Sequence, residues 1–143
     1  MATGLQRLVR RALLARLKAN APLTALVPVG SINPAGDPVW PFVILRAPIS
    51  RPLRAASLRG QEGSFDIHAF ARAREVDGAE VETGEDHAGR IGAAIETCLE
   101  PNRLTLEDGS VVRISLTDMR LLPDESPGDY HYFAQVNWRA LAS

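Results

Sequence analysis

The chain has 143 residues, of which 45% are hydrophobic and 23% are charged, and its formal net charge at pH 7 is −1. These values are typical of one globular domain over residues 1–143, and no apolar run approaches the roughly 18 residues that a membrane span requires. The single cysteine, Cys98, excludes an internal disulfide and a cysteine-rich metal site.

The small net charge conceals a strong asymmetry along the chain. Residues 1–60 carry nine basic side chains and one acidic side chain, whereas residues 61–143 carry seven basic and sixteen acidic ones. Opposite charges of this size can pair within one fold or between copies of it. They bear on partners and association rates rather than on the fold itself.

The first predicted element is an amphipathic helix over residues 4–19. Apolar residues recur there at helical spacing, and most basic side chains lie outside that stripe. Thr3 is a candidate N-cap, and residues 23–27 can add a short helical turn. An Arg-rich, acid-free N-terminus also resembles an organellar transit peptide, but a continuous apolar stripe is what a first helix docked on a core needs.

Two strand-like runs, residues 39–47 and 64–71, flank a long cationic span. Its four basic residues are Arg46, Arg51, Arg54 and Arg59. The span is too long for a tight hairpin turn, and Pro48 and Pro52 remove backbone donors, which argues against a central strand. We therefore expect a protruding loop around residues 46–63 that needs a negatively charged partner.

An acidic loop is expected next, over residues 73–86. Its carboxylates are Glu75, Asp77, Glu80, Glu82, Glu85 and Asp86. Thr83 followed by Asp86 resembles a capping box, which predicts a helix from this point to about Leu99. Pro101 ends that helix, because proline cannot continue the hydrogen-bonded backbone.

The last third of the chain predicts three strands. Asp108–Gly109 is a two-residue hairpin signal, and a change of apolar parity predicts a bulge near residues 117–118. Residues 130–138 alternate cleanly between apolar and polar side chains. The order α-β-β-α-β-β-β predicts an α+β fold, with an antiparallel sheet of about four to five strands and two main helices packed on one face.

Catalytic and metal-binding patterns are absent from the sequence. The histidines His68, His87 and His131 are far apart in the chain and lack a metal-ligand spacing. Ser64, Asp66 and His68 are the residue types of a hydrolase triad, but at alternate positions of one strand they run parallel instead of converging. We expect no enzyme, no cofactor and no metal site.

The two charged segments leave several interpretations open. The acidic loop lacks the residue order of a calcium loop, and a solvated charge run is the simpler interpretation. The arginine span can be a solvated loop, or a phosphate contact without base reading, although it has no aromatic residues for stacking on bases. It also suits a protein interface, because arginine pairs bidentately with carboxylates.

The order of segments resembles that of one family over nearly the whole chain. An N-terminal helix with ALLARLKANAPLTALV leads to a strand with PFVIL, and SRPLRAASLRG enters a strand with GSFDIHAFAR. The helix HAGRIGAAIETCLE and the closing strand HYFAQVNWRAL follow an acidic linker. This series resembles the tail-terminator (tail-completion) proteins of long-tailed bacteriophages and of phage-like gene transfer agents.

The resemblance implies a structural virion protein without catalysis. It implies a homo-oligomer, a hexameric ring that ends the tail tube and joins the tail to the neck of the head. The implied partners are the major tail tube protein and a neck or stopper protein, with DNA passing through the ring without sequence-specific binding. The implied location is the virion tail or neck, after assembly in the cytoplasm of the bacterial host.

An alternative is a nucleic-acid-binding accessory protein, or a neck adaptor of the packaging and head-completion machinery. For a ring, the subunit contacts are head-to-tail, so one patch meets a different patch on the next copy. A basic arm and an acidic loop on one chain are complementary in this sense. The expected interface residues are Arg46, Arg51, Arg54, Arg59, Glu75, Asp77, Glu80 and Glu82.

Overall fold

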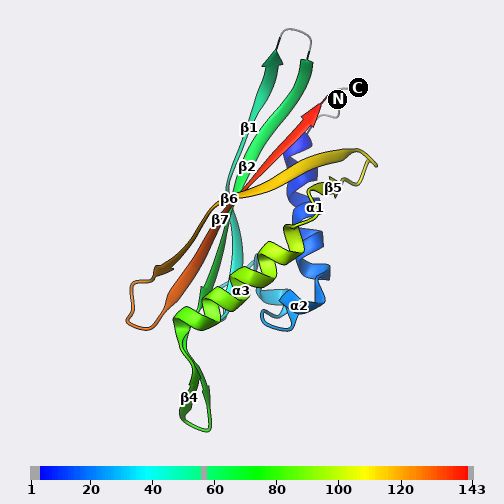
Figure 1. Ribbon diagram of the computed structural model, residues 1–143. Coiled ribbons are helices and arrows are strands. Elements are labelled where there is room, and N and C mark those ends of the chain that lie inside the picture. The colour runs from blue at the N-terminus through cyan, green and yellow to red at the C-terminus, as the bar shows by residue number, and fades with distance from the viewer. Residues whose placement is uncertain (1–3, 56–57, 142–143) are drawn as a thin grey trace.

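The computed structural model describes residues 4–55 and 58–141 (Figure 1). The helices are α1 (Leu5–Ala19), α2 (Ala21–Thr24) and α3 (Gly84–Leu99), with a 3-10 turn at Val29–Ser31. The strands are β1 (Phe42–Ala55), β2 (Leu58–Ala71), β3 (Arg74–Val76), β4 (Ala79–Glu82), β5 (Arg103–Thr105), β6 (Val111–Pro123) and β7 (Tyr130–Leu141). Among these residues, no helix is long and apolar enough to cross a membrane.

A curled antiparallel sheet of five strands forms the body of the molecule, in the order β1-β2-β7-β6-β5, and β3 and β4 form a separate two-stranded hairpin. The molecule is elongated: the β1–β2 hairpin projects at one end and the β3–β4 hairpin at the opposite end (Figure 1). The predicted mixture of helices with an antiparallel sheet is confirmed. The predicted order omitted α2 and the β3–β4 hairpin.

The core lies between the helices and one face of the sheet. Helix α1 buries residues at helical spacing, namely Leu5, Val9, Leu13 and Leu17. Strand β7 buries every second residue, namely Tyr132, Ala134, Val136 and Trp138. These side chains join the buried face of α3 in one hydrophobic cluster. The alternation predicted for β7 is confirmed. The residues that alternate with these buried ones lie on the other face of the sheet, away from the helices.

The span predicted as an irregular arm is a β-hairpin. Strand β1 continues to Ala55 and β2 begins at Leu58, with Arg54 opposite Arg59 in the register. One bulge interrupts the pairing between Arg46 and Ile49. The prolines at positions 48 and 52 are tolerated because β1 is an edge strand of the sheet, and in the described part of the chain these positions are paired on the β2 side alone.

The predicted acidic loop is also wrong in detail, because residues 74–82 form the β3–β4 hairpin. Its two-residue turn is Asp77–Gly78, with φ of 52° and 80°. Positive φ at both positions is the geometry of a type I′ turn, for which Asp-Gly is a favoured pair. Helix α3 then begins as predicted: the Thr83 hydroxyl accepts a hydrogen bond of 3.1 Å from the Asp86 backbone N–H.

Two further predictions concern the C-terminal strands. The backbone N–H of Gly109 donates to the Leu106 carbonyl at 2.9 Å, which closes the predicted β5–β6 hairpin. The register of β6 shifts between Thr117 and Arg120 around a positive φ at Asp118, so the predicted bulge is confirmed. The N-cap of α1 is Gly4, and the predicted cap Thr3 lies outside the described residues.

Candidate subunit interface

On the face of the sheet that points away from the helices, one row of paired residues crosses all five strands and has a charged side chain on each of them. The register places Arg51 opposite Glu62, Glu62 opposite Arg139, Arg139 opposite Arg113, and Arg113 opposite Arg103. We call these five residues the cationic row. Since neighbouring strands lie about 4.8 Å apart, the row crosses about 19 Å of the sheet.

The arginines of the cationic row outnumber its one carboxylate. Glu62 accepts from Arg139 at 3.1 Å and forms an ion pair with Arg51 at 3.4 Å. None of the ion pairs among the described residues includes Arg103 or Arg113, and both side chains are exposed. A groove of about 470 Å³ runs along this part of the sheet. The groove therefore presents an excess of positive charge to solvent.

The β3–β4 hairpin presents the opposite charge at the far end of the molecule. Glu75, Asp77 and Glu80 are exposed, and none of them forms an ion pair within the described part of the chain. Glu75 and Glu80 lie directly opposite each other across the two strands. The hairpin also exposes two apolar side chains, with Val76 at 52% and Val81 at 54%.

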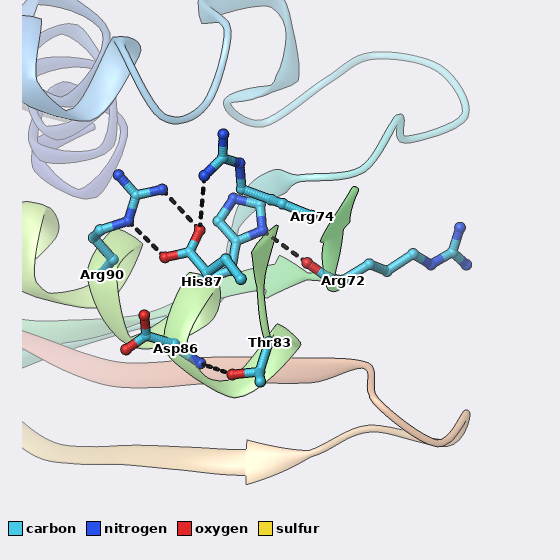
Figure 2. Close-up of polar contacts among 7 residues, drawn as sticks. Arg72, Arg74, Thr83, Asp86, His87 and Arg90 are labelled. Atoms are coloured by element: carbon cyan, nitrogen blue, oxygen red, sulfur yellow. Dashed lines mark hydrogen bonds and ion pairs between the residues drawn. The ribbon is translucent and has the colours of Figure 1, made fainter. Parts of the chain in front are cut away.

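Glu82 behaves differently from the other predicted acidic residues. Its carboxylate accepts two hydrogen bonds of 2.9 Å from Arg90 and one of 3.3 Å from Arg74. In Figure 2 these contacts are the dashed lines that run from Arg74 and Arg90 to the carboxylate without a label. Only 8% of the Glu82 side chain is exposed. The hydrogen bonds from Arg90 lower the pKa of Glu82 from 4.5 to about 2. Glu82 thus ties the hairpin to α3 within one subunit.

The junction between β2, the hairpin and α3 is held by a second set of contacts. The Nδ1 atom of buried His87 lies 2.8 Å from the Arg72 carbonyl oxygen (Figure 2). The Arg72 guanidinium in turn lies 4.1 Å above the Trp40 ring and 3.3 Å from the Asp129 carboxylate. His87 therefore has a structural partner, and the base of the hairpin is fixed relative to the sheet.

We expect Glu82→Gln to lower the free energy of unfolding by about 1 kcal/mol, because a hydrogen-bonded ion pair to partly exposed arginines is lost. The folded-state pKa of Glu82 lies below its ordinary value, so its stabilising effect is complete above pH 4.5 and declines as the pH falls toward about 2. Thermal melts between pH 7 and pH 2.5 should show the difference between wild type and variant shrinking over that window.

Glu80→Gln is the matched control for this prediction, since Glu80 lies on the same strand without an ion pair in the described part of the chain. It should change the melting temperature little and show no such pH window. Equal effects of the two substitutions would contradict a specific role for Glu82.

The structure brings together two of the histidines that are far apart in the sequence. The rings of His68 and His131 lie 5.4 Å apart on the outer face of the sheet, beside Phe70 and Phe133. Burial lowers the pKa of His68, and the neighbouring His131 and Arg46 lower it further. Among residues 4–55 and 58–141, no group of three or more metal-ligating side chains is placed to hold an ion.

The predicted interface residues are distributed over three places. Arg51 lies in the cationic row, Arg46 is exposed on the same strand, and the side chains of Arg54 and Arg59 lie outside the described part of the chain. The acidic residues lie on the β3–β4 hairpin, with Glu82 turned inward to its two arginines. Glu62, Arg103, Arg113 and Arg139 are not among the residues predicted for the interface. The alternation of their strands marks Arg113 and Arg139 as outward-facing, whereas Glu62 lies in the span that was predicted as a loop.

Two comparisons with known proteins bear on the family and the fold of the chain. The family described as "Tail completion protein gp17" matches residues 11–141 of the chain. A chain from a solved structure, "Virion of native gene transfer agent (GTA) particle", matches with a TM-score of 0.74 and 17% sequence identity, covering 99% of this chain and 100% of that chain. No curated protein matches the sequence.

The structural match shows a shared fold, and the family match extends over most of the chain. Together they confirm the resemblance that the order of sequence segments indicated. The chain belongs to the tail completion protein gp17 family and is a structural tail protein.

Proposed function

We propose that the protein forms a closed ring that ends polymerisation of the tail tube and joins the tail to the neck of the head. The observation that carries the proposal is that one subunit presents opposite charges on two separate surfaces: the cationic row on the sheet, and the acidic β3–β4 hairpin, which projects at one end of the molecule (Figure 1). Two different patches on one chain make a heterologous contact, and heterologous contacts generate rings when the rotation closes. Six copies are the number that the family resemblance implies.

In this proposal the ring binds the major tail tube protein on one side and a neck or stopper protein on the other. DNA passes through the opening without sequence-specific binding, and the ring assembles in the cytoplasm of the bacterial host before it enters the virion. The β1–β2 hairpin, which projects from the body, is a natural contact arm toward a neighbouring subunit, the tube or the neck.

A non-enzymatic role is consistent with the chemistry of the described residues. Ser64, Asp66 and His68 occupy alternate positions of β2 and share no hydrogen bond with one another in the described structure. Cys98 is buried in the core, and burial raises the pKa of its thiol, which disfavours the reactive thiolate. These features support structural assembly as the role of the protein.

The mass of the assembled protein tests the proposal. Native mass spectrometry and negative-stain microscopy should show a closed ring, either for the purified protein or in the presence of the tail tube protein. A strict monomer in both settings would overturn the proposal.

We expect the triple charge reversal Arg51→Glu, Arg54→Glu and Arg59→Glu to weaken assembly while leaving the fold intact, because all three substitutions lie on the projecting β1–β2 hairpin. Circular dichroism should report an unchanged fold, and native mass spectrometry a smaller assembled fraction. Reversal of Arg7, Arg10 and Lys18, which are exposed on α1, is the matched control. Unchanged assembly of the hairpin variant would remove the arm from the interface.

A nucleic-acid-binding accessory protein is the second candidate, and the arginines of the cationic row favour it. Binding through phosphates alone predicts an affinity for duplex DNA that falls steeply with salt. A fluorescence anisotropy titration at two salt concentrations decides this point, and the absence of salt-sensitive binding would dismiss the candidate.

A further inference from the structure

We infer that the β3–β4 hairpin of one copy docks on the cationic row of the next, with the Glu75 and Glu80 carboxylates facing Arg113 and Arg139. The inference rests on the proposed ring and names the surfaces that close it. It differs from the contact expected from the sequence, because three arginines of the row come from β5, β6 and β7 instead of the arm.

The first argument is the electrostatic repulsion between two carboxylates of the hairpin. Glu75 and Glu80 are directly opposite each other on two strands that, within residues 4–55 and 58–141, form a sheet of their own. Like charges in directly opposed positions destabilise a strand pair, and a lone two-stranded hairpin is marginally stable in water. A cationic partner placed over the two carboxylates would remove this repulsion.

The second argument is the matching repulsion in the cationic row. Arg113 lies between Arg139 and Arg103 in the register, so three arginines on adjacent strands face one another. Glu62, the carboxylate of the row, is already shared between Arg51 and Arg139. Local conflicts of this kind are expected at functional sites, and each of the two surfaces carries the charge that relieves the other.

The third argument is shape and apolar complementarity. The hairpin is exposed along β3 and along most of β4, and it presents Val76 and Val81. Exposed Val111 and Ile49, each at 52%, lie two positions from Arg113 and Arg51 in their strands. The groove of about 470 Å³ beside the row can receive a narrow element. The contact would thus bury apolar surface as well as pair charges.

The two surfaces cannot meet within one chain. Figure 1 shows the hairpin labelled β4 at one end of the molecule, whereas the strand ends that carry Arg51 and Arg139 lie toward the other end. The Glu82 contacts with Arg74 and Arg90 further hold the base of the hairpin to α3. The occupant is therefore a second copy, and a head-to-tail arrangement follows.

A second copy accounts for the observations better than DNA does. Glu62 lies between Arg51 and Arg139, so a series of phosphates along the whole row would bring one of them against this carboxylate, whereas the two hairpin carboxylates need only Arg113 and Arg139. If the row bound phosphate instead, the opposed carboxylates of Glu75 and Glu80 would remain without a cationic partner. We therefore assign the row to the acidic hairpin, and binding of duplex DNA is an outcome that the experiment must distinguish.

A charge-swap experiment tests the inference with two full-length variants. The hairpin variant carries Glu75→Arg and Glu80→Arg, and the row variant carries Arg113→Glu and Arg139→Glu. In each variant alone the hairpin and the row carry charge of the same sign and repel each other. The assembled fraction measured by native mass spectrometry should therefore fall at least tenfold. In an equimolar mixture each contact again joins opposite charges, and rings of alternating subunits in a 1:1 ratio should form.

Matched controls keep the change in net charge constant. Glu100→Arg with Glu125→Arg, and Arg7→Glu with Arg10→Glu, alter exposed residues that belong to neither surface. These variants should assemble like wild type. If a reversed variant fails to fold by circular dichroism, the neutral pairs Glu75→Gln with Glu80→Gln and Arg113→Gln with Arg139→Gln replace it. The neutral pairs should retain or raise the melting temperature of the subunit while assembly weakens.

Each result has a distinct meaning. Assembly of wild type, its loss in both variants and its recovery in the mixture would support the docking. Unchanged assembly of the variants, or loss without recovery in the mixture, would overturn the docking while leaving the ring in place. Loss of DNA binding in the row variant with assembly intact would assign the row to DNA instead. Failure of wild type to assemble, alone or with the tube protein, would overturn the proposed function itself.

Discussion

Replacement of Gly92 by alanine is expected to lower the free energy of unfolding by about 1–3 kcal/mol, the usual cost of overpacking a core. A Cβ at this position of α3 would lie 2.7 Å from ring carbons of Tyr132. That ring cannot move aside easily, because Tyr132 is buried in β7 and its hydroxyl donates to the Glu96 carboxylate at 3.2 Å. Thermal or denaturant unfolding measures the effect.

Gly89→Ala is a control from the same helix with the opposite expected sign. A Cβ there would meet Leu121 at 3.7 Å, an ordinary contact. Alanine should therefore raise the free energy of unfolding by about 0.5–1 kcal/mol through its better helix propensity. The cost of Gly92→Ala should also shrink in a Tyr132→Ala background. Equal stabilisation by both glycine replacements would contradict the close approach of α3 to β7.

Trp138→Ala is expected to cost about 3–5 kcal/mol, a large part of the 5–15 kcal/mol that stabilises a typical domain. Trp138 is 2% exposed and is among the largest fully buried side chains described. It packs beneath Gly63, where an added Cβ would lie 2.7 Å from the indole ring. Calorimetry or denaturant unfolding followed by circular dichroism is the suitable measurement.

Two variants sharpen this second prediction. Trp138→Phe keeps most of the buried ring, and it loses no hydrogen bond within the described structure because the indole N–H has no acceptor there. It should cost clearly less than Trp138→Ala. Trp40→Ala removes a half-buried ring outside the main core cluster and should also cost less. Similar losses for Trp40→Ala and Trp138→Ala would contradict the central place of Trp138 in the core.

Much of the fold could be predicted because local patterns and tertiary packing agree. The apolar stripe of α1 and the alternation of β7 each face the one core cluster, so periodicity alone located both elements. The Thr83 cap and the Asp108–Gly109 turn are set by contacts within a few residues. The bulge beside Asp118 could also be predicted, because the apolar residues of this strand change there from even-numbered to odd-numbered positions.

The two errors have different physical causes. The β1–β2 hairpin was missed because Pro48 and Pro52 argue against a strand only where both edges are paired, and edge position is a tertiary property. The β3–β4 hairpin did carry a signal, the Asp77–Gly78 pair between short strand-like runs. The density of carboxylates around that pair obscured it.

The candidate interface could be predicted less completely than the fold. Charge division along the chain indicated a basic surface from residues 1–60 and an acidic one from residues 61–143. The acidic β3–β4 hairpin does come from the second segment, but so do all residues of the cationic row except Arg51. The cationic row, however, joins residues from five strands, and only the register of the sheet places Arg103, Arg113 and Arg139 in one row with Glu62. The inward role of Glu82 likewise depends on the position of Arg90 in α3.

The proline-bearing strand β1 also restricts how copies of the chain can associate. A 14-residue strand at the margin of a sheet ordinarily exposes a row of free backbone donors and acceptors that another chain can extend by strand addition. Pro48 and Pro52 each delete a donor from β1, and the bulge after Arg46 twists it. The β1 margin is therefore a poor template for open-ended β-polymerisation into fibres, and copies that meet there are left to associate through their side chains.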